Sequence, residues 1–211
     1  MSMKNEKIYQ DLKQKIINEE LLPGQWLVER EIGEVYSISR TPVREVLRRL
    51  VADGFLELKP GKGYLVRKLS LEEIIEIFQA REAIEGMAAR LACQKGEESF
   101  FARIKEIRQR LEKLNLEEDS AAGVVIGNEL HGTIAEAADN SLVFEFYEKL
   151  KNLAALTRNI SKKSVGIEKR SKEAHLALMK ALEEKDADKS EQYMREHLRS
   201  TCRSLIKTYL V

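Results

Sequence analysis

Three histidines are the residues of this sequence best suited to chemistry. The chain has only His131, His175 and His197, and each falls on the apolar side of its own predicted helix. Neutral imidazole is a common ligand of divalent metals, and an unpaired imidazole in an apolar core is costly. Three inward-facing rings on three helices could therefore converge on one metal ion. The alternative is that each ring is a core residue with an ordinary hydrogen-bond partner.

Ring nitrogens favour zinc or nickel over calcium or magnesium, which prefer oxygen ligands. Around these histidines the sequence offers no candidate general base, and the chain contains no HExxH, GxSxG, phosphate-loop or dinucleotide motif. The histidines therefore indicate sensing, and we expect no enzyme activity. The competing hypothesis is a three-histidine metallohydrolase with an accessory winged-helix module, which would turn over esters or phosphoesters with zinc.

A second polar group lies at the start of a predicted helix near the N-terminus. Residues 39–44 read Ser-Arg-Thr-Pro-Val-Arg. Arginine pairs bidentately with guanine or with phosphate, and the first turn of a helix has backbone N–H groups to offer a phosphate. Pro42 is tolerated there because those N–H groups lack intrahelical partners. The segment predicts a helix that reads base edges in the major groove.

The elements around this segment predict a winged helix-turn-helix. Ile8, Leu12 and Ile16 recur every four residues and mark a first helix, and a short second helix spans the apolar positions of residues 28–36. The third helix has an apolar arc and a polar arc; the first holds Val43, Val46, Leu47 and Leu50, and the second holds Arg40, Thr41, Arg44 and Arg48. Two strand-like runs, residues 55–59 and 64–68, flank a turn at 60–63 and complete a β-hairpin wing.

We expect this wing and the third helix to contact DNA together. Gly61 and Gly63 let the backbone approach a duplex while Lys62 neutralises phosphate charge, and Arg30 would orient the domain on the backbone. The candidate DNA-binding residues are Arg30, Ser39, Arg40, Thr41, Arg44, Arg48, Gly61, Lys62 and Gly63. A solvated helix face, or a winged domain that contacts protein, is the alternative interpretation.

The rest of the chain is predicted to be all-helical. From about residue 71 helical patterns follow one another, broken by polar stretches at 95–97, 117–121, 139–141, 161–166 and 185–189. This length suits six or seven helices. We therefore predict a mainly α protein with a winged helix-turn-helix over residues 1–69 and an all-α bundle over residues 70–211.

Composition sets broad limits on the class of protein. Lys and Arg number 36 and Asp and Glu 35, so net charge alone does not indicate a nucleic-acid partner. No apolar run is long enough for a signal sequence or a membrane span, so we expect a soluble, cytoplasmic protein with no membrane partner. Cys93 and Cys202 lack paired spacing, which predicts free thiols in a reducing compartment.

The first unit resembles the GntR family of transcription regulators. Three segments carry the resemblance: Leu27-Val28-Glu29-Arg30-Glu31, residues 39–50 (SRTPVREVLRRL), and Asp53-Gly54-Phe55. The resemblance implies a DNA-binding regulator in which Arg30, Arg40, Thr41, Arg44 and a wing glycine contact DNA.

The helical part resembles the FCD effector-binding domain of the FadR subfamily. The matching motifs are Leu130-His131 through Asp139-Asn140, Glu173-Ala174-His175 followed by Lys185-Asp186, and Glu196-His197-Leu198. Metal-binding members have these three histidines and usually an Asp or Asn four residues before the first. Here that position is Gly127, with Asn128 next to it. This departure leaves the fourth ligand to Asn128, to water or to an effector carboxylate.

Effectors of this family are typically small carboxylates such as organic acids. A cationic side chain inside the bundle would suit one, and Arg81 and Arg158 are the candidates, although either could belong to a salt bridge instead. We therefore predict a ligand-responsive repressor that binds a palindromic operator in double-stranded DNA as a homodimer. The C-terminal helices are the predicted dimer interface. Effector binding would change the spacing of the two reading helices. The same regulator without a metal is the alternative.

Overall fold

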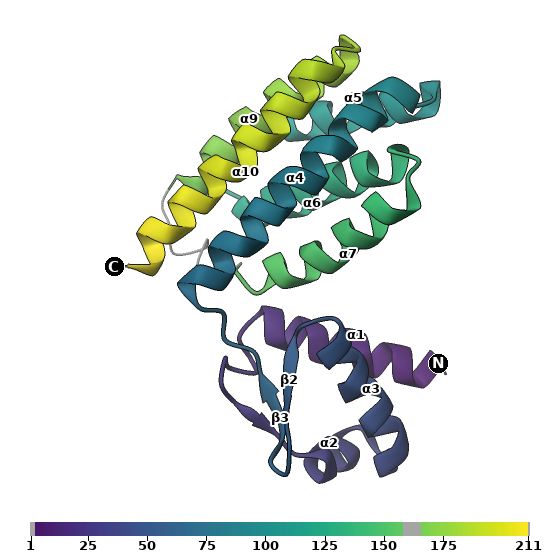
Figure 1. The fold of residues 1–211 in the computed structure, drawn as a ribbon, viewed down its shortest axis with the longest axis vertical. Coiled ribbons are helices and arrows are strands. Elements are labelled where there is room, and N and C mark those ends of the chain that lie inside the picture. Colours follow the sequence, from purple (N-terminus) through teal and green to yellow (C-terminus); the bar gives the residue numbers. More distant parts are fainter. Residues whose placement is uncertain (1–2, 158–165, 211) are drawn as a thin grey trace. The chain divides into compact units, whose positions relative to one another are not determined.

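The computed structural model describes residues 3–157 and 166–210. It is mainly helical and contains one small antiparallel sheet (Figure 1). The chain divides into two compact units, with the division between Ser70 and Leu71. The first unit also takes in the end of the helix Ser141–Ala155 (α7), from Lys151 on, while the rest of this helix belongs to the second unit. The sequence pattern does not predict this return of the chain.

Three helices form the body of the first unit: α1 (Met3–Ile17), α2 (Glu29–Tyr36) and α3 (Arg40–Ala52). The predicted apolar arc of α3 supplies the centre of the core, because Val43, Val46, Leu47 and Leu50 are completely buried. They cluster with apolar side chains of α1 such as Ile8 and Leu12. Burial of one arc fixes the opposite arc of α3 toward solvent.

The sheet has three strands, β1 (Trp26–Leu27), β2 (Leu56–Lys59) and β3 (Gly63–Val66), in the order β1-β3-β2. β2 and β3 form the predicted hairpin, with Leu56 opposite Val66 and Lys59 opposite Gly63. Its turn needs glycine, because Gly61 and Gly63 have φ angles of 72° and 105°. The short β1 was not predicted, since two residues cannot show an alternating pattern.

Within the described residues, the second unit contains six helices. They are α4 (Leu71–Lys95), α5 (Glu98–Lys113), α6 (Ser120–Ala137), α7 (Ser141–Ala155), α9 (Ile167–Glu183) and α10 (Ala187–Tyr209). The predicted all-helical class is confirmed. α4 and α10 lie side by side, and α9 packs on α10, α5 and α6 (Figure 1).

Helix ends in this unit follow the polar breaks of the sequence. The side chain of Asp119 caps α6 by accepting a hydrogen bond from the backbone N–H of Ala122 at 2.9 Å. Asp186 caps α10 in the same way through the N–H of Lys189 at 3.0 Å. None of the helices in the described ranges is both long and apolar enough to cross a membrane.

Candidate metal centre and DNA-reading face

The packing of α6, α9 and α10 brings the three histidines to one point. His131 lies on α6, His175 on α9 and His197 on α10, and each is buried. The Nε2 atom of His175 lies 3.2 Å from Nε2 of His131 and 3.2 Å from Nε2 of His197. One nitrogen from each ring fits within a group no wider than 4.8 Å. The convergence expected from the three apolar faces is therefore present.

These separations suit a single tetrahedral ion. Nitrogens that sit about 2.0–2.1 Å from a zinc ion in tetrahedral geometry are about 3.3 Å apart. Two of the nitrogen pairs are already at 3.2 Å, and the third is within 4.8 Å. Three such donors leave one coordination position open for another ligand.

The three rings cannot all form good hydrogen bonds with one another in this arrangement. A neutral ring nitrogen has either one N–H or one lone pair, so Nε2 of His175 can form a good bond with only one of its two neighbours. Nδ1 of His131 lies 2.5 Å from Oε2 of Glu85. Because a carboxylate accepts, the proton of a neutral His131 sits on Nδ1 and its Nε2 presents a lone pair. A cation accepts lone pairs from all three nitrogens.

Glu85 is held in its charged form at the side of His131. It is buried on α4, and Arg81 donates from Nε to its Oε1 at 2.6 Å. Burial by itself would raise the pKa of Glu85, but the charge of Arg81 and the hydrogen bonds from His131 and Arg81 outweigh burial and hold this pKa at about 2. A carboxylate behind a histidine fixes the ring orientation and its tautomer, as in many metal sites.

The other two rings are neutral as well. Burial is the main cause that lowers the pKa of His175, to about 3. Burial and the neighbouring His175 lower the pKa of His197 as well. Their lone pairs are therefore available to a metal near neutral pH.

Asn128, predicted as a possible fourth ligand, is exposed on α6, whereas its neighbour Gly127 lies against His175. Gly127 is buried against His175, and a Cβ at this position would lie 2.8 Å from Cε1 of that ring. Asn128 is exposed, since one residue along α6 turns the side chain by about 100°. The structure thus does not bring Asn128 to the histidines.

Of the two arginines predicted to bind the effector, the structure describes only Arg81. Arg81 is engaged with Glu85 and supports His131 from behind. Arg158 lies outside the described residues. Glu85 was missed, although its position carried a signal: a lone carboxylate on the α4 face that also holds the buried Phe78 and Ala88.

In the first unit, the predicted DNA-binding residues lie on α2 (Arg30), at the N-cap and on the exposed side of α3, and on the wing. Arg30, Ser39, Arg40, Thr41, Arg44, Arg48, Gly61 and Lys62 are exposed, and Gly63 is partly exposed. Ser39 is at the N-cap position of α3, but its side chain makes no capping hydrogen bond. Its hydroxyl is therefore available to a ligand.

Arg44 is already oriented by an acidic neighbour. Its Nε donates to both carboxylate oxygens of Glu29 on α2, at 2.8 and 2.9 Å. The hydrogen bond and charge of Glu29 raise the pKa of Arg44. Because more than half of the Arg44 side chain is exposed, its remaining N–H groups can meet a phosphate or base edge.

Comparison with known proteins agrees with both units. Residues 4–66 match the family described as bacterial regulatory proteins, gntR family, and residues 76–200 match the FCD domain. The chain is 27% identical over 205 residues to the HTH-type transcriptional repressor RspR of Escherichia coli K12, covering 95% of this chain and 88% of RspR. It is 27% identical over 198 residues to the HTH-type transcriptional repressor GlaR of the same organism, covering 90% of each.

The fold has a solved counterpart. The structure of E. coli McbR/YncC superposes with a TM-score of 0.82 at 22% identity, and the match covers 99% of this chain and 100% of that one.

Proposed function

Because this chain belongs to the GntR family of bacterial regulatory proteins and carries an FCD domain, we propose that it is a metal-dependent, carboxylate-responsive repressor. The coarser part of this statement follows from the family: the protein is a DNA-binding transcription regulator and not an enzyme. The metal, the effector, the repressor role and the dimer are the proposal.

The observation that best supports a metal site is the contact of one ring nitrogen with two others. Nε2 of His175 lies 3.2 Å from its counterparts in His131 and His197. Neutral nitrogens on all sides favour zinc or nickel. When bound, such an ion would supply a Lewis acid for an oxygen of the effector, while Glu85 keeps His131 in the ligand tautomer.

For DNA, the proposal assigns base reading to the start of α3 and phosphate contacts to the wing and Arg30. Support comes from the exposure of these residues, and from the completely buried apolar arc of α3, which leaves the opposite side of that helix to solvent. Two such units in a homodimer joined through the helical domain would read the half-sites of a palindromic operator. RspR and GlaR are both described as repressors, which supports the same role here.

Elemental analysis of the purified full chain tests the metal. We expect about one equivalent of zinc or nickel per chain, lost in His175→Ala. Asn128→Ala is the matched control, because Asn128 is on α6 next to the site but exposed, and it should keep the metal. A wild-type chain that binds neither metal when dialysed against it would contradict the metal-dependent mechanism.

A further inference from the structure

We propose that the cleft between the α5–α6 connection and the start of α9 binds a small organic cation. The ammonium group of this ligand pairs with the carboxylate of Glu168, and its apolar body lies against the leucines of the cleft wall. None of the three histidines and none of the predicted DNA-binding residues lines this cleft. The inference therefore goes beyond the proposed function and does not depend on it.

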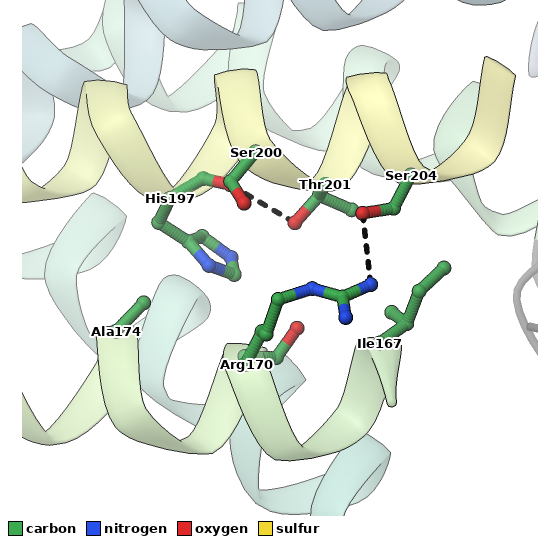
Figure 2. A pocket seen from close by; sticks show the side chains of 8 residues that line it. Ile167, Arg170, Ala174, His197, Ser200, Thr201 and Ser204 are labelled. Carbon is green, nitrogen blue, oxygen red and sulfur yellow. Dashed lines mark hydrogen bonds between the residues drawn. The ribbon is translucent and has the colours of Figure 1, made fainter. Parts of the chain in front are cut away.

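The cleft is large enough for such a ligand. Its volume is about 790 Å³, and small-molecule sites in proteins typically measure about 300–1,000 Å³. By contrast, the notch beside His197 between α9 and α10 has a volume of about 20 Å³, which is room for about one water molecule (Figure 2). Of these two hollows, only the cleft can hold an organic molecule.

Apolar side chains form part of the cleft wall. Leu114 and Leu116 come from the α5–α6 connection, Val124 from α6 and Leu176 from α9. All four are partly exposed in the free chain. A ligand with an apolar body would remove their surface from water, which favours binding.

Hydrogen bonds hold the α5–α6 connection in place. Lys172 on α9 donates from Nζ to the backbone carbonyls of Glu112 and Leu114, at 3.2 and 2.8 Å. Within the connection, the backbone N–H of Glu117 donates to Oδ1 of Asn115 at 3.1 Å. The cleft is therefore preformed, and a ligand orders little of the chain when it binds.

Glu168 is a partly buried carboxylate that lines this cleft without a cation. Within residues 3–157 and 166–210 it forms no ion pair and no hydrogen bond. Its Oε2 lies against Gly123 of α6, 3.9 Å from the position that a Cβ would take there. Burial raises the pKa of Glu168, because nothing beside it favours the charged form. A ligand cation would offset this cost.

Basic residues close to Glu168 in the sequence are directed elsewhere. The guanidinium of Arg170 extends toward α10, where Nη2 donates to Oγ of Ser204 at 3.1 Å (Figure 2). The ammonium of Lys172 is engaged with carbonyls at the end of α5, which is the negative end of the helix dipole. The ammonium group of a ligand can therefore take the position beside Glu168 that neither of these side chains fills.

The charge of the lining favours an organic cation over an anion or a metal ion. Glu117, Glu168 and Glu173 line the cleft with two lysines, so an anion would meet three carboxylates. Within the described ranges, the three histidines are the group of side chains close enough to hold a metal, and these glutamates form no such group. An ammonium group needs only one carboxylate.

A ligand-observed NMR titration of the full chain with phenethylamine tests the proposal. We expect this ammonium to bind with a dissociation constant on the order of millimolar, and its neutral analogue phenethyl alcohol to bind at least about tenfold more weakly. Glu168→Gln should weaken the amine by about tenfold or more. Glu98→Gln is the matched control, because Glu98 is exposed in the first turn of α5, as Glu168 is in the first turn of α9, and lies outside the lining.

The unfolding temperature without ligand separates binding from a structural role. Glu168→Gln removes a charge that has no partner among the described residues, so its unfolding temperature should not fall below that of the wild type. A fall together with weaker binding would assign Glu168 to the fold and overturn the site. Equal affinity for the amine in wild type and Glu168→Gln, or equal affinity of the wild type for amine and alcohol, overturns it as well.

A chelator distinguishes the cleft from the metal centre. Affinity for phenethylamine should be the same with and without EDTA, since Glu168 needs no metal to bind an ammonium. Affinity that disappears with EDTA would place the amine on a metal ion and overturn the cleft as its site. A wild type that binds no phenethylamine at about ten millimolar also overturns the proposal.

Discussion

A buried carboxylate determines how His131 presents its nitrogen. Glu85 lies between Arg81 and His131, at 2.6 and 2.5 Å, and is almost fully buried. Its charge binds the Nδ1 proton, so Nε2 faces the other two rings as a lone pair. Metal binding at the three histidines would therefore depend on a side chain that is not itself a ligand.

Glu85→Gln should lower zinc affinity by about 10- to 100-fold, because an amide holds the His131 proton less strongly and leaves Arg81 unpaired. Zinc affinity is measured by competition with a chelator on the folded full chain. Glu82→Gln is the control. Glu82 lies on α4 like Glu85, but it is partly exposed and pairs with Arg199. Equal losses in both variants would mean that Glu85 acts only through helix stability.

Gly127→Ala tests the closest backbone approach in the centre. The added Cβ would lie 2.8 Å from Cε1 of His175, so the ring must shift away from its neighbours. We expect weaker zinc binding by about an order of magnitude, while Gly132→Ala on the same helix, whose Cβ would meet only the Tyr147 hydroxyl at 3.6 Å, keeps wild-type affinity. Unchanged zinc binding in Gly127→Ala would show that the ring is not confined there.

At the scale of the element, the third helix of the first unit separates packing from reading. Val43, Val46, Leu47 and Leu50 hold α3 in the core, and Arg40 and Arg44 project from the other side. Arg44→Ala should therefore weaken specific operator binding by about 1–3 kcal/mol without unfolding the chain. Fluorescence anisotropy on operator and scrambled duplexes measures the loss. Arg103→Ala, at an exposed position of α5, removes the same charge from the second unit and should leave binding near wild type.

The wing should act through phosphate and not through sequence. Lys62 is exposed in the turn between β2 and β3. Lys62→Ala should weaken binding to operator and scrambled duplex alike, and should reduce the slope of log affinity against log salt by about 1. Lys180→Ala on α9 is the exposed lysine control. A loss confined to the operator would instead assign base reading to Lys62.

Much of this architecture was readable from apolar spacing, since that spacing reports which face of a helix is buried. It predicted the arcs of α3 and the inward rings of His131, His175 and His197. Spacing does not report which other helix covers a face, so Glu85, 46 residues before His131, was missed as its partner. Spacing also could not show that Arg81 pairs with Glu85, so Arg81 was predicted to bind the effector. Asn128 was predicted to bind the metal because it follows Gly127 in the sequence, and the structure shows it exposed.

At the scale of the whole molecule, the metal would connect helices that are distant in sequence. His131, His175 and His197 come from α6, α9 and α10, so an ion bound by all three stabilises only the folded arrangement. Zinc at a hundred times its dissociation constant should add about 2.7 kcal/mol to the free energy of unfolding. Thermal unfolding with and without zinc measures this, and His175→Ala should lose the shift.

The proposed homodimer makes a geometric prediction about the operator. Two α3 helices related by a twofold axis meet the same face of the duplex only when the half-sites are separated by whole turns of about 10 bp. Duplexes selected from random sequence by the full chain should therefore be palindromic. Adding about half a turn between the half-sites should lower affinity toward that of a single half-site, and adding a full turn should restore part of it, because only then do both helices face the same side again. Binding of one chain per selected duplex, or indifference to a half-turn insertion, would exclude symmetric reading and leave α3 as a monomeric reader.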